Sequence, residues 1–237
     1  MTPRSLFAAL ALLSQAPTAP AQFGLPKQPA EPNFTRTEDV VYGRRDGHAL
    51  TLDVFAPKDK KPNGAAVIFC VSAGFQSSKE SLDRVHALIV PEFTGRGYTV
   101  FAVMHSSLPK YSIPEIVEDM HRAVRFVKAG AKKYHIDPDK VGIAGASSGG
   151  HLSLMMGCDG RAGDPDAKDE VERQSSRVAA VACFFPPTDF PAFEKNPPKE
   201  FDPEGLFPFR ELKNGKYVNI DEKRRQEIGR ACSPLYC

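Results

Sequence analysis

A Gly-X-Ser-X-Gly pattern runs from Gly145 to Gly149 and places Ser147 at its centre. It follows a short apolar stretch, 141–146, which predicts a buried strand, and it leads into residues that predict a helix beginning near Ser148. A serine on such a sharp turn can act as a nucleophile, because the helix N-terminus directs unsatisfied amide groups toward an oxyanion beside it. Gly145 and Gly149 fit this interpretation, since the strained turn needs small residues on both sides. The alternative is a glycine-rich turn that binds an anion or only packs tightly, although no nucleotide-binding fingerprint is present.

A serine nucleophile needs a base to take its proton, and histidine most often has this role. No histidine follows His151 in the sequence. His151 lies four residues after Ser147 in the same predicted helix, where its ring does not readily come within about 3 Å of the serine hydroxyl. His105 ends a predicted strand at the carboxyl edge of the sheet, with another strand expected between it and Ser147. We therefore expect His105 to be a candidate for substrate contact rather than the base.

Other residues of catalytic or metal-binding type are expected to be structural. Asp189 could be taken for a triad acid, but a structural or loop-capping role is favoured. Cys70 and Cys183 lie in apolar runs typical of a core, and the other cysteines lack metal-ligand spacing, so we expect no metal site and leave any disulfide pairing open. The remaining histidines are expected to be solvated or half-buried: His48, His86, His121 and His135.

The elements that must position Ser147 alternate between strand-like and helix-like patterns, which indicates an α/β domain. Asp46-Gly47 predicts the turn of an opening hairpin. Ser77 with Glu80, and Ser112 with Glu115, have the spacing of helix capping boxes. The expected strands are 38–43, 49–57, 65–72, 98–105, 141–146 and 177–185, and the expected crossover helices are 77–93 and 112–127.

Composition bounds the class of protein. The 237 residues are 41% hydrophobic and 25% charged, which fits one globular domain. Residues 1–21 have the basic start, short apolar core and small-residue cleavage site of a secretory signal peptide, so we expect export to the periplasm or beyond. A Pro-rich linker is expected at 22–37 and the domain at 38–237. The net charge of +2 gives no indication of a nucleic-acid or membrane partner.

The stretches "GIAGASSGGHLSLMMG", "EIVEDMHRAVRFVKAGAKKYHIDPDKVG" and "FFPPTDF" resemble exported bacterial α/β-hydrolases of the acetyl-xylan-esterase and hormone-sensitive-lipase-like type. The resemblance implies an α/β-hydrolase fold, a mostly parallel sheet with helices on both faces. It implies that Ser147 is the nucleophile and that the amide of Ser148 is the first oxyanion donor. The family's HGGGW-like loop is matched by Val71-Ser72-Ala73-Gly74-Phe75, so Ala73 and Gly74 become candidates for the other donors, although Val71, Ser72 and Ala73 depart from the usual histidine and glycines.

The same resemblance implies a triad acid and histidine after strands that this sequence does not contain. We expect the strand 177–185 to be an apolar edge prone to aggregation. A truncated chain or gene model is the economical interpretation, in which DNA beyond the codon for Cys237 encodes the remaining strands, an Asp and a His. The polar, Pro-interrupted segment at about 190–231 is expected to be a cap-like insertion.

The resulting hypothesis is a serine hydrolase of carboxylic esters, with short acyl groups or acetylated carbohydrates as substrates and no cofactor. As this chain it is expected to be inactive or weakly active. One alternative is a non-catalytic remnant or binding protein, which an active-site fluorophosphonate label would distinguish. Another is a peptidase of the prolyl-oligopeptidase type, for which this chain has no room for the propeller domain.

Overall fold

The computed structural model describes residues 32–195, 210–214 and 216–237. The predicted signal peptide, 1–21, and most of the predicted linker lie outside these residues. Within them, no helix has the length and apolar character needed to cross a membrane.

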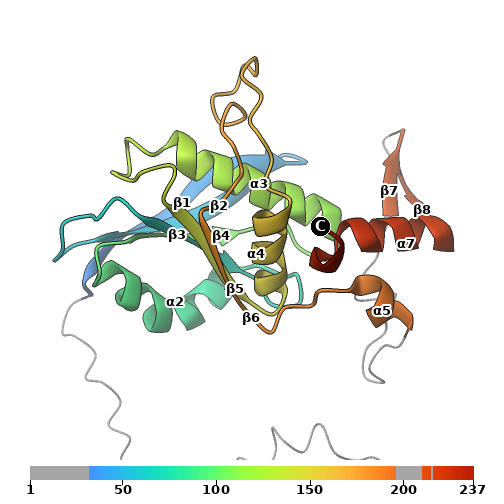
Figure 1. Cartoon of the computed structure of the whole chain (residues 1–237), viewed down its shortest axis with the longest axis horizontal. Helices are drawn as coiled ribbons and strands as arrows, with labels where there is room; N and C mark the ends of the chain where they lie inside the picture. Colours follow the sequence, from blue (N-terminus) through green and yellow to red (C-terminus); the bar gives the residue numbers. More distant parts are fainter. Residues whose placement is uncertain (1–31, 196–209, 215) are drawn as a thin grey trace, which may run out of the picture. The chain divides into compact units, whose positions relative to one another are not determined.

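A mixed sheet of six strands forms the centre of the described domain, in the order β1-β2-β4-β3-β5-β6 (Figure 1). The strands β4, β3, β5 and β6 give three parallel pairs, while β1 and β2 form an antiparallel hairpin and β2 also runs antiparallel to β4. The mostly parallel α/β sheet is therefore confirmed. The strand bounds are β1 Phe34–Arg45, β2 His48–Pro57, β3 Ala66–Val71, β4 Thr99–Met104, β5 Val141–Ala146 and β6 Ala180–Phe184.

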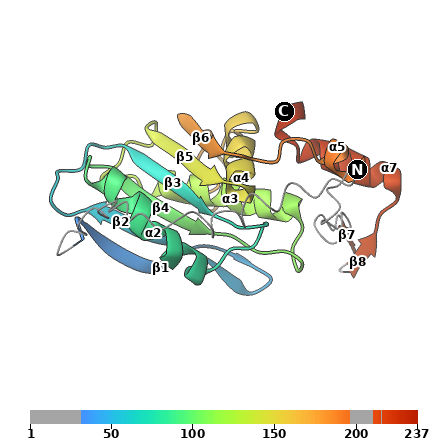
Figure 2. The ribbon, with the colours of Figure 1, turned by 90° about the horizontal axis from the view of Figure 1, so that it is seen from below.

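Helices cover both faces of this sheet (Figures 1 and 2). The helix α2, Lys79–Thr94, packs on one face through Leu82 and Val90. The helices α3, Ile113–Ala129, and α4, Ser148–Cys158, pack on the other. Each parallel crossover therefore lies over buried apolar strand residues, as the near-continuous apolar runs predict.

Local turn and capping chemistry accounts for several element ends. The β1–β2 turn uses left-handed backbone at Asp46 (φ 47°) and Gly47 (φ 82°), as the Asp-Gly pair predicts. In α3 the Ser112 backbone N–H donates to Glu115 Oε2 over 2.7 Å. The prediction for α2 is wrong by one residue, because the hydroxyl of Ser77 donates to the Val71 carbonyl and Ser78 caps the helix instead.

The hairpin begins earlier than expected. β1 starts at Phe34, inside the predicted linker 22–37, and Phe34 is paired with Pro57. The Phe34 and Phe55 ring centroids lie 5.2 Å apart in an edge-on contact. This aromatic contact stabilises the pairing at Phe34, where the Pro-rich composition predicts a linker.

The described part of the predicted cap-like insertion contains helices and a second, two-stranded sheet. Residues 196–209 and 215 of that insertion lie outside the described residues. A disulfide joins Cys158 at the end of α4 to Cys237, which supplies the pairing that the sequence left open. The element bounds are α5 Phe190–Lys195, β7 Arg210–Lys213, β8 Lys216–Asn219, α7 Glu222–Ala231 and the 3-10 helix η2 Pro234–Tyr236.

The strand β6 is an edge of the described sheet, where it pairs with β5 alone. Its residues Ala180 and Ala182 are exposed, and the side chains of Phe184 and Phe185 are 62% and 78% exposed. The expected apolar edge is therefore present, and its tendency to aggregate stays a prediction.

Candidate active site

Ser147 occupies a strained turn between β5 and α4. Its φ of 53° and ψ of −124° lie outside the regions that residues with a side chain ordinarily adopt. Its backbone N–H donates to the Phe184 carbonyl over 2.9 Å, and its carbonyl accepts from the His151 N–H over 3.0 Å. The side chain is half-buried at the carboxyl edge of β5. This is the arrangement in which a serine hydroxyl can meet a substrate at the edge of a parallel sheet.

The two glycines of the Gly-X-Ser-X-Gly pattern allow the turn to close. A Cβ on Gly145 would lie closer than 3.0 Å to the carbonyl oxygen of Gly149. A Cβ on Gly149 would lie 2.7 Å from the carbonyl oxygen of Cys70 on β3. Because each neighbour is backbone, neither contact is relieved by a side-chain rotation. The glycines thus permit both the strained serine and the close approach of α4 to β3.

The predicted loop donors Ala73 and Gly74 differ in availability. The Ala73 N–H donates to the Gln76 carbonyl over 2.9 Å, and the Gln76 N–H donates back to Ala73 over 3.0 Å. Left-handed backbone at Gly74 (φ 57°) and Phe75 (φ 59°) closes this small turn. The amide of Ala73 is therefore occupied, which disagrees with its expected role, whereas that of Gly74 has no partner among the described residues. Gly74 and the helix N-terminal amide of Ser148 stay as the predicted donors.

A hydroxyl pair that the sequence did not indicate connects the two sides of this region. Ser72 Oγ at the end of β3 lies 2.9 Å from Ser148 Oγ at the start of α4. Ser148 is buried and Ser72 is half-buried. The signal that could have found this pair is Ser72, which departs from the glycine that the resemblance to the HGGGW-like loop implies. Its hydrogen bond fixes the loop that carries Gly74 against the residue that follows Ser147.

His151 is a packing residue and not a base, which agrees with the expectation that its ring does not reach the Ser147 hydroxyl. Its ring is fully buried, with centroids 5.3 Å from Phe75 and 4.8 Å from Phe190. Since a carbonyl only accepts, Nδ1 must carry the hydrogen in its 3.0 Å contact with the Pro187 oxygen. Burial lowers the pKa of His151 to about 4, so the imidazole is neutral near pH 7.

The other histidines do not reach Ser147 either. His105 lies just after β4, and β3 separates β4 from β5, as the sequence predicts. The chain contains six histidines, all within the described residues, and none of them is hydrogen-bonded to Ser147 Oγ. Asp189 accepts from the Ala192 N–H over 3.1 Å, which bears out a loop-capping role.

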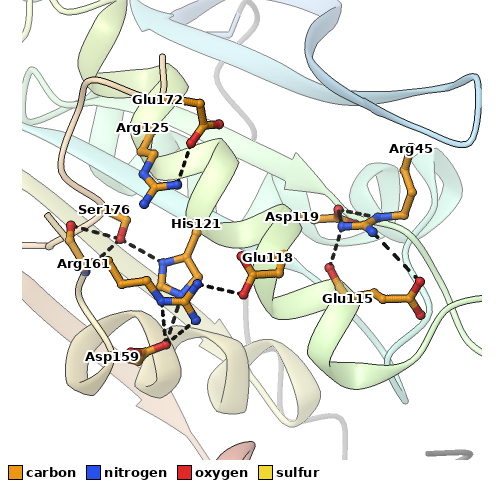
Figure 3. A network of polar contacts seen from close by, with 10 residues as sticks. All are labelled: Arg45, Glu115, Glu118, Asp119, His121, Arg125, Asp159, Arg161, Glu172 and Ser176. Atoms are coloured by element: carbon orange, nitrogen blue, oxygen red, sulfur yellow. Dashed lines mark hydrogen bonds and ion pairs between the residues drawn. The ribbon is translucent and has the colours of Figure 1, made fainter. Parts of the chain in front are cut away.

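His121 belongs to a separate polar network that connects α3 with the end of α4 and with the loop that carries Ser176 (Figure 3). Its Nδ1 lies 2.8 Å from Ser176 Oγ, and its Nε2 lies 3.3 Å from Asp159 Oδ2. His121 is 0% exposed, so the expectation of a solvated or half-buried residue is wrong. Burial, together with the neighbouring Arg161 guanidinium, lowers the pKa of His121 and favours the neutral ring. The chain Ser176–His121–Asp159 has the connectivity of a triad, yet Ser176 is also 0% exposed and has no access to a substrate.

No group of three or more His, Cys, Asp or Glu side chains in the described ranges is arranged to hold a metal ion. What the site contains is a strained serine, a helix N-terminus and an adjacent loop in which the Gly74 amide has no partner among the described residues. On this sheet topology, these features define the α/β-hydrolase class.

The BD-FAE family model matches residues 52–234, and the chain therefore belongs to the BD-FAE family. Among named relatives, the "probable carboxylic ester hydrolase LipM" of Mycobacterium tuberculosis is 29% identical over 159 residues, covering 67% of this chain and 36% of the relative. "Esterase LipC" of the same organism is 27% identical over 153 residues, covering 64% and 37%. The chain thus spans little more than a third of these relatives.

Solved structures give a longer match. A truncated carbohydrate esterase from gut microbiota is 25% identical with a TM-score of 0.66, covering 89% of this chain and 75% of that one. Esterase 2 of Thermogutta terrifontis in its apo form is 23% identical with a TM-score of 0.58, covering 90% and 69%, and supports the fold alone.

Proposed function

We propose that this chain is a serine hydrolase that cleaves carboxylic esters through an acyl-enzyme on Ser147. The observation that carries the proposal is the backbone of Ser147, whose φ of 53° and ψ of −124° persist only because Gly145 and Gly149 leave room for them. Backbone strain of this kind costs about 1–3 kcal/mol and clusters at functional sites, because packing alone does not require it. Membership of an esterase family with carboxylic ester hydrolases among its relatives supports the same chemistry.

In the proposed reaction Ser147 Oγ attacks the ester carbonyl carbon, and the negative charge forms on the carbonyl oxygen. The amides of Ser148 and Gly74 donate to that oxygen, and the positive end of α4 adds to their effect. The C–O bond to the alcohol then breaks, water protonates the departing oxygen, and the acyl group stays on Ser147. A second water attacks the acyl carbonyl carbon and releases the acid and the free serine.

No basic side chain among the described residues is hydrogen-bonded to Ser147 Oγ, so in this proposal solvent takes its proton. In related serine hydrolases, the oxyanion hole and binding alone give about 10³ to 10⁴-fold acceleration over water when triad members are removed. We therefore propose weak turnover for this chain.

The favoured substrates are esters of short acyl groups or acetylated carbohydrates. The carbohydrate esterase among the solved relatives supports this choice. We also propose export, for which the cleavage-site pattern at Ala19-Pro20-Ala21 and the Cys158–Cys237 disulfide, typical of oxidising compartments, are the support.

Hydrolysis of p-nitrophenyl acetate by the full chain tests this proposal. We expect slow turnover that is abolished in Ser147→Ala and retained in Ser176→Ala. Equal rates for the intact chain and Ser147→Ala would contradict it. They would favour instead a non-catalytic binding protein, an alternative supported by the absence, among the described residues, of a base that is hydrogen-bonded to Ser147.

A further inference from the structure

Two phenylalanines at the end of β6 lie beside the turn that carries Ser147. The Phe184 carbonyl accepts from the Ser147 N–H over 2.9 Å. The strand register pairs Phe184 with Ala146, the residue before Ser147, and paired side chains on neighbouring strands leave the sheet on the same face. Phe184 is therefore a direct neighbour of the proposed nucleophile, on the strand at the edge of the described sheet (Figure 2).

The loop that follows Phe184 is also fixed to the first turn of α4. The Pro187 carbonyl accepts from His151 Nδ1 over 3.0 Å. A Cβ on Gly150 would lie 3.0 Å from the Phe184 carbonyl oxygen and 3.3 Å from Pro186 Cβ, so the glycine allows this close approach. Because two consecutive prolines restrict the backbone between these contacts, the loop holds Phe184 and the residue after it in a fixed place beside α4.

Phe185 has a backbone conformation that a bulky residue rarely adopts, with φ at 38°. The side chains of Val181 and Cys183, which alternate with it along the strand, are half-buried. Regular alternation would place Phe185 on their face of the sheet. Its side chain is instead 78% exposed. The left-handed backbone thus interrupts the alternation, and the Phe185 ring lies in solvent.

Packing does not account for these two exposed rings. Left-handed backbone at a residue other than glycine costs free energy, and strain of this kind clusters at functional sites. An exposed phenylalanine also forgoes the gain of burial, and Phe184 is 62% exposed. Adjacent exposed apolar side chains are typical of a binding surface, and an aromatic ring offers a flat apolar face to a ligand. The place of this surface, next to Ser147, indicates the ester as its ligand.

We infer that Phe184 and Phe185 bind a ring carried by the ester that Ser147 attacks, and that they select such esters against open-chain esters of the same size. The apolar face of the ligand ring packs on the two phenylalanine rings. An aryl ring and the apolar face of a sugar ring both have this chemistry. Since the subsite is defined by its place beside Ser147, this inference rests on the proposed function.

The test measures binding to the full chain with Ser147→Ala, which leaves the esters intact, labelled with ¹³C at phenylalanine. Phenyl acetate and cyclohexyl acetate are the ring probes, and n-hexyl acetate is the open-chain probe of equal carbon number. We expect saturable shifts of the Phe184 and Phe185 resonances, and about two- to tenfold tighter binding of a ring probe than of n-hexyl acetate. Burial alone would favour n-hexyl acetate, which has the larger apolar surface. An acetylated methyl xyloside distinguishes a sugar ring from an aryl ring as the source.

Phe184→Leu and Phe185→Leu, added to Ser147→Ala, keep an apolar side chain and remove the ring. Each should weaken binding of the ring probes about two- to tenfold and leave the binding of n-hexyl acetate unchanged. Phe93→Leu is the matched control, because it makes the same change on α2, where the Phe93 carbonyl accepts from the Tyr98 N–H just before β4. Its affinities should equal those of Ser147→Ala alone.

Binding of n-hexyl acetate as tight as that of the ring probes would overturn the inference, as would equal weakening in Phe185→Leu and Phe93→Leu. Shifts of the Phe184 and Phe185 resonances that follow protein concentration instead of ligand would also overturn it, because a second copy of the chain would then cover the rings. Fluorophosphonate labelling of the intact chain separates the two proposals. Labelling of Ser147 without ring selectivity would contradict the inference alone, whereas ring binding without labelling would contradict the proposed function.

Discussion

Ser147 and Ser176 each have one half of what a serine hydrolase needs. Ser147 has a strained backbone, partial exposure and a helix N-terminus, but no histidine against its hydroxyl. Ser176 has a histidine at 2.8 Å and, beyond it, a carboxylate at 3.3 Å, but is completely buried. Ser147 thus has the reactive geometry without the hydrogen-bonded partners, whereas Ser176 has the partners without the reactive geometry.

The surroundings of Ser176 are those of a structural network. Its backbone N–H donates to the Arg161 carbonyl over 2.9 Å, so it has no free amide for an oxyanion. Its hydroxyl also accepts from the Arg161 N–H over 3.0 Å. Asp159 is 2.6 Å from the Arg161 guanidinium, which takes part of the charge that would support an imidazolium. Ser176, His121 and Asp159 therefore stabilise the fold, while Ser147 has the strained backbone on which the proposed chemistry depends.

The largest expected effect concerns the strained turn. Gly145→Ala places a Cβ against the Gly149 carbonyl, and we expect the free energy of unfolding to fall by about 3 kcal/mol or more. Gly142→Ala on the same strand is the matched control, because the nearest heavy atom to its Cβ is at 3.5 Å, an ordinary contact. Urea unfolding of both variants measures the difference, and equal stabilities would show that the turn is not tight.

The second prediction concerns acid stability. His151 has a pKa of about 4 in the folded chain and about 6.5 in an unfolded one. As the pH falls from about 6.5 to 4, the unfolded chain binds a proton there that the native chain does not, so stability is lost. We expect His151 to account for roughly 3 kcal/mol of that loss.

The control for acid stability is His151→Phe, which keeps an aromatic ring between Phe75 and Phe190. Its unfolding free energy, measured by urea at a series of pH values, should fall less steeply between pH 6.5 and 4 than that of the intact chain. A slope remains, since burial also lowers the pKa of His121 and His105. Identical slopes in the two proteins would contradict the assignment.

A smaller effect is expected at the buried network. Ser176→Ala leaves the Arg161 N–H and His121 Nδ1 without this partner, and should lower the free energy of unfolding by roughly 1–2 kcal/mol. Because Ser176 is structural, the rate of fluorophosphonate labelling at Ser147 should be unchanged. Loss of labelling in the folded variant would contradict the structural role assigned to Ser176.

The smallest effect is expected at the hydroxyl pair. Ser72→Ala removes the 2.9 Å contact with Ser148 and should slow labelling of Ser147 about threefold, with little change in stability. Ser175→Ala is the control, since its hydroxyl bonds to the Arg161 carbonyl and not to the turn at Ser147. Equal labelling rates in Ser72→Ala and the intact chain would show that the pair does not position the loop.

Local patterns in the sequence predicted the elements that carry Ser147. The Asp46-Gly47 hairpin, the capping of α3 and the turn at Ser147 all depend on residues near one another in the chain. The shift of the α2 cap from Ser77 to Ser78 has a tertiary cause, the bond from Ser77 to Val71 on β3.

Contacts between residues far apart in the chain could not be predicted from the sequence. His121 and Ser176 are 55 residues apart, and no spacing rule relates them. Cys158 and Cys237 are 79 apart, and three cysteines without a pattern allow several pairings. The occupied amide of Ala73 follows from a turn with left-handed residues at Gly74 and Phe75, of which only the glycine is a sequence signal.

The most direct test of the comparison is the site at which a fluorophosphonate reacts with the intact chain, read by peptide mass spectrometry. The strained, half-buried Ser147 should carry the adduct, the adduct should disappear in Ser147→Ala, and it should persist in Ser176→Ala. An adduct on Ser176, or none on a folded chain even at long exposure, would contradict the account.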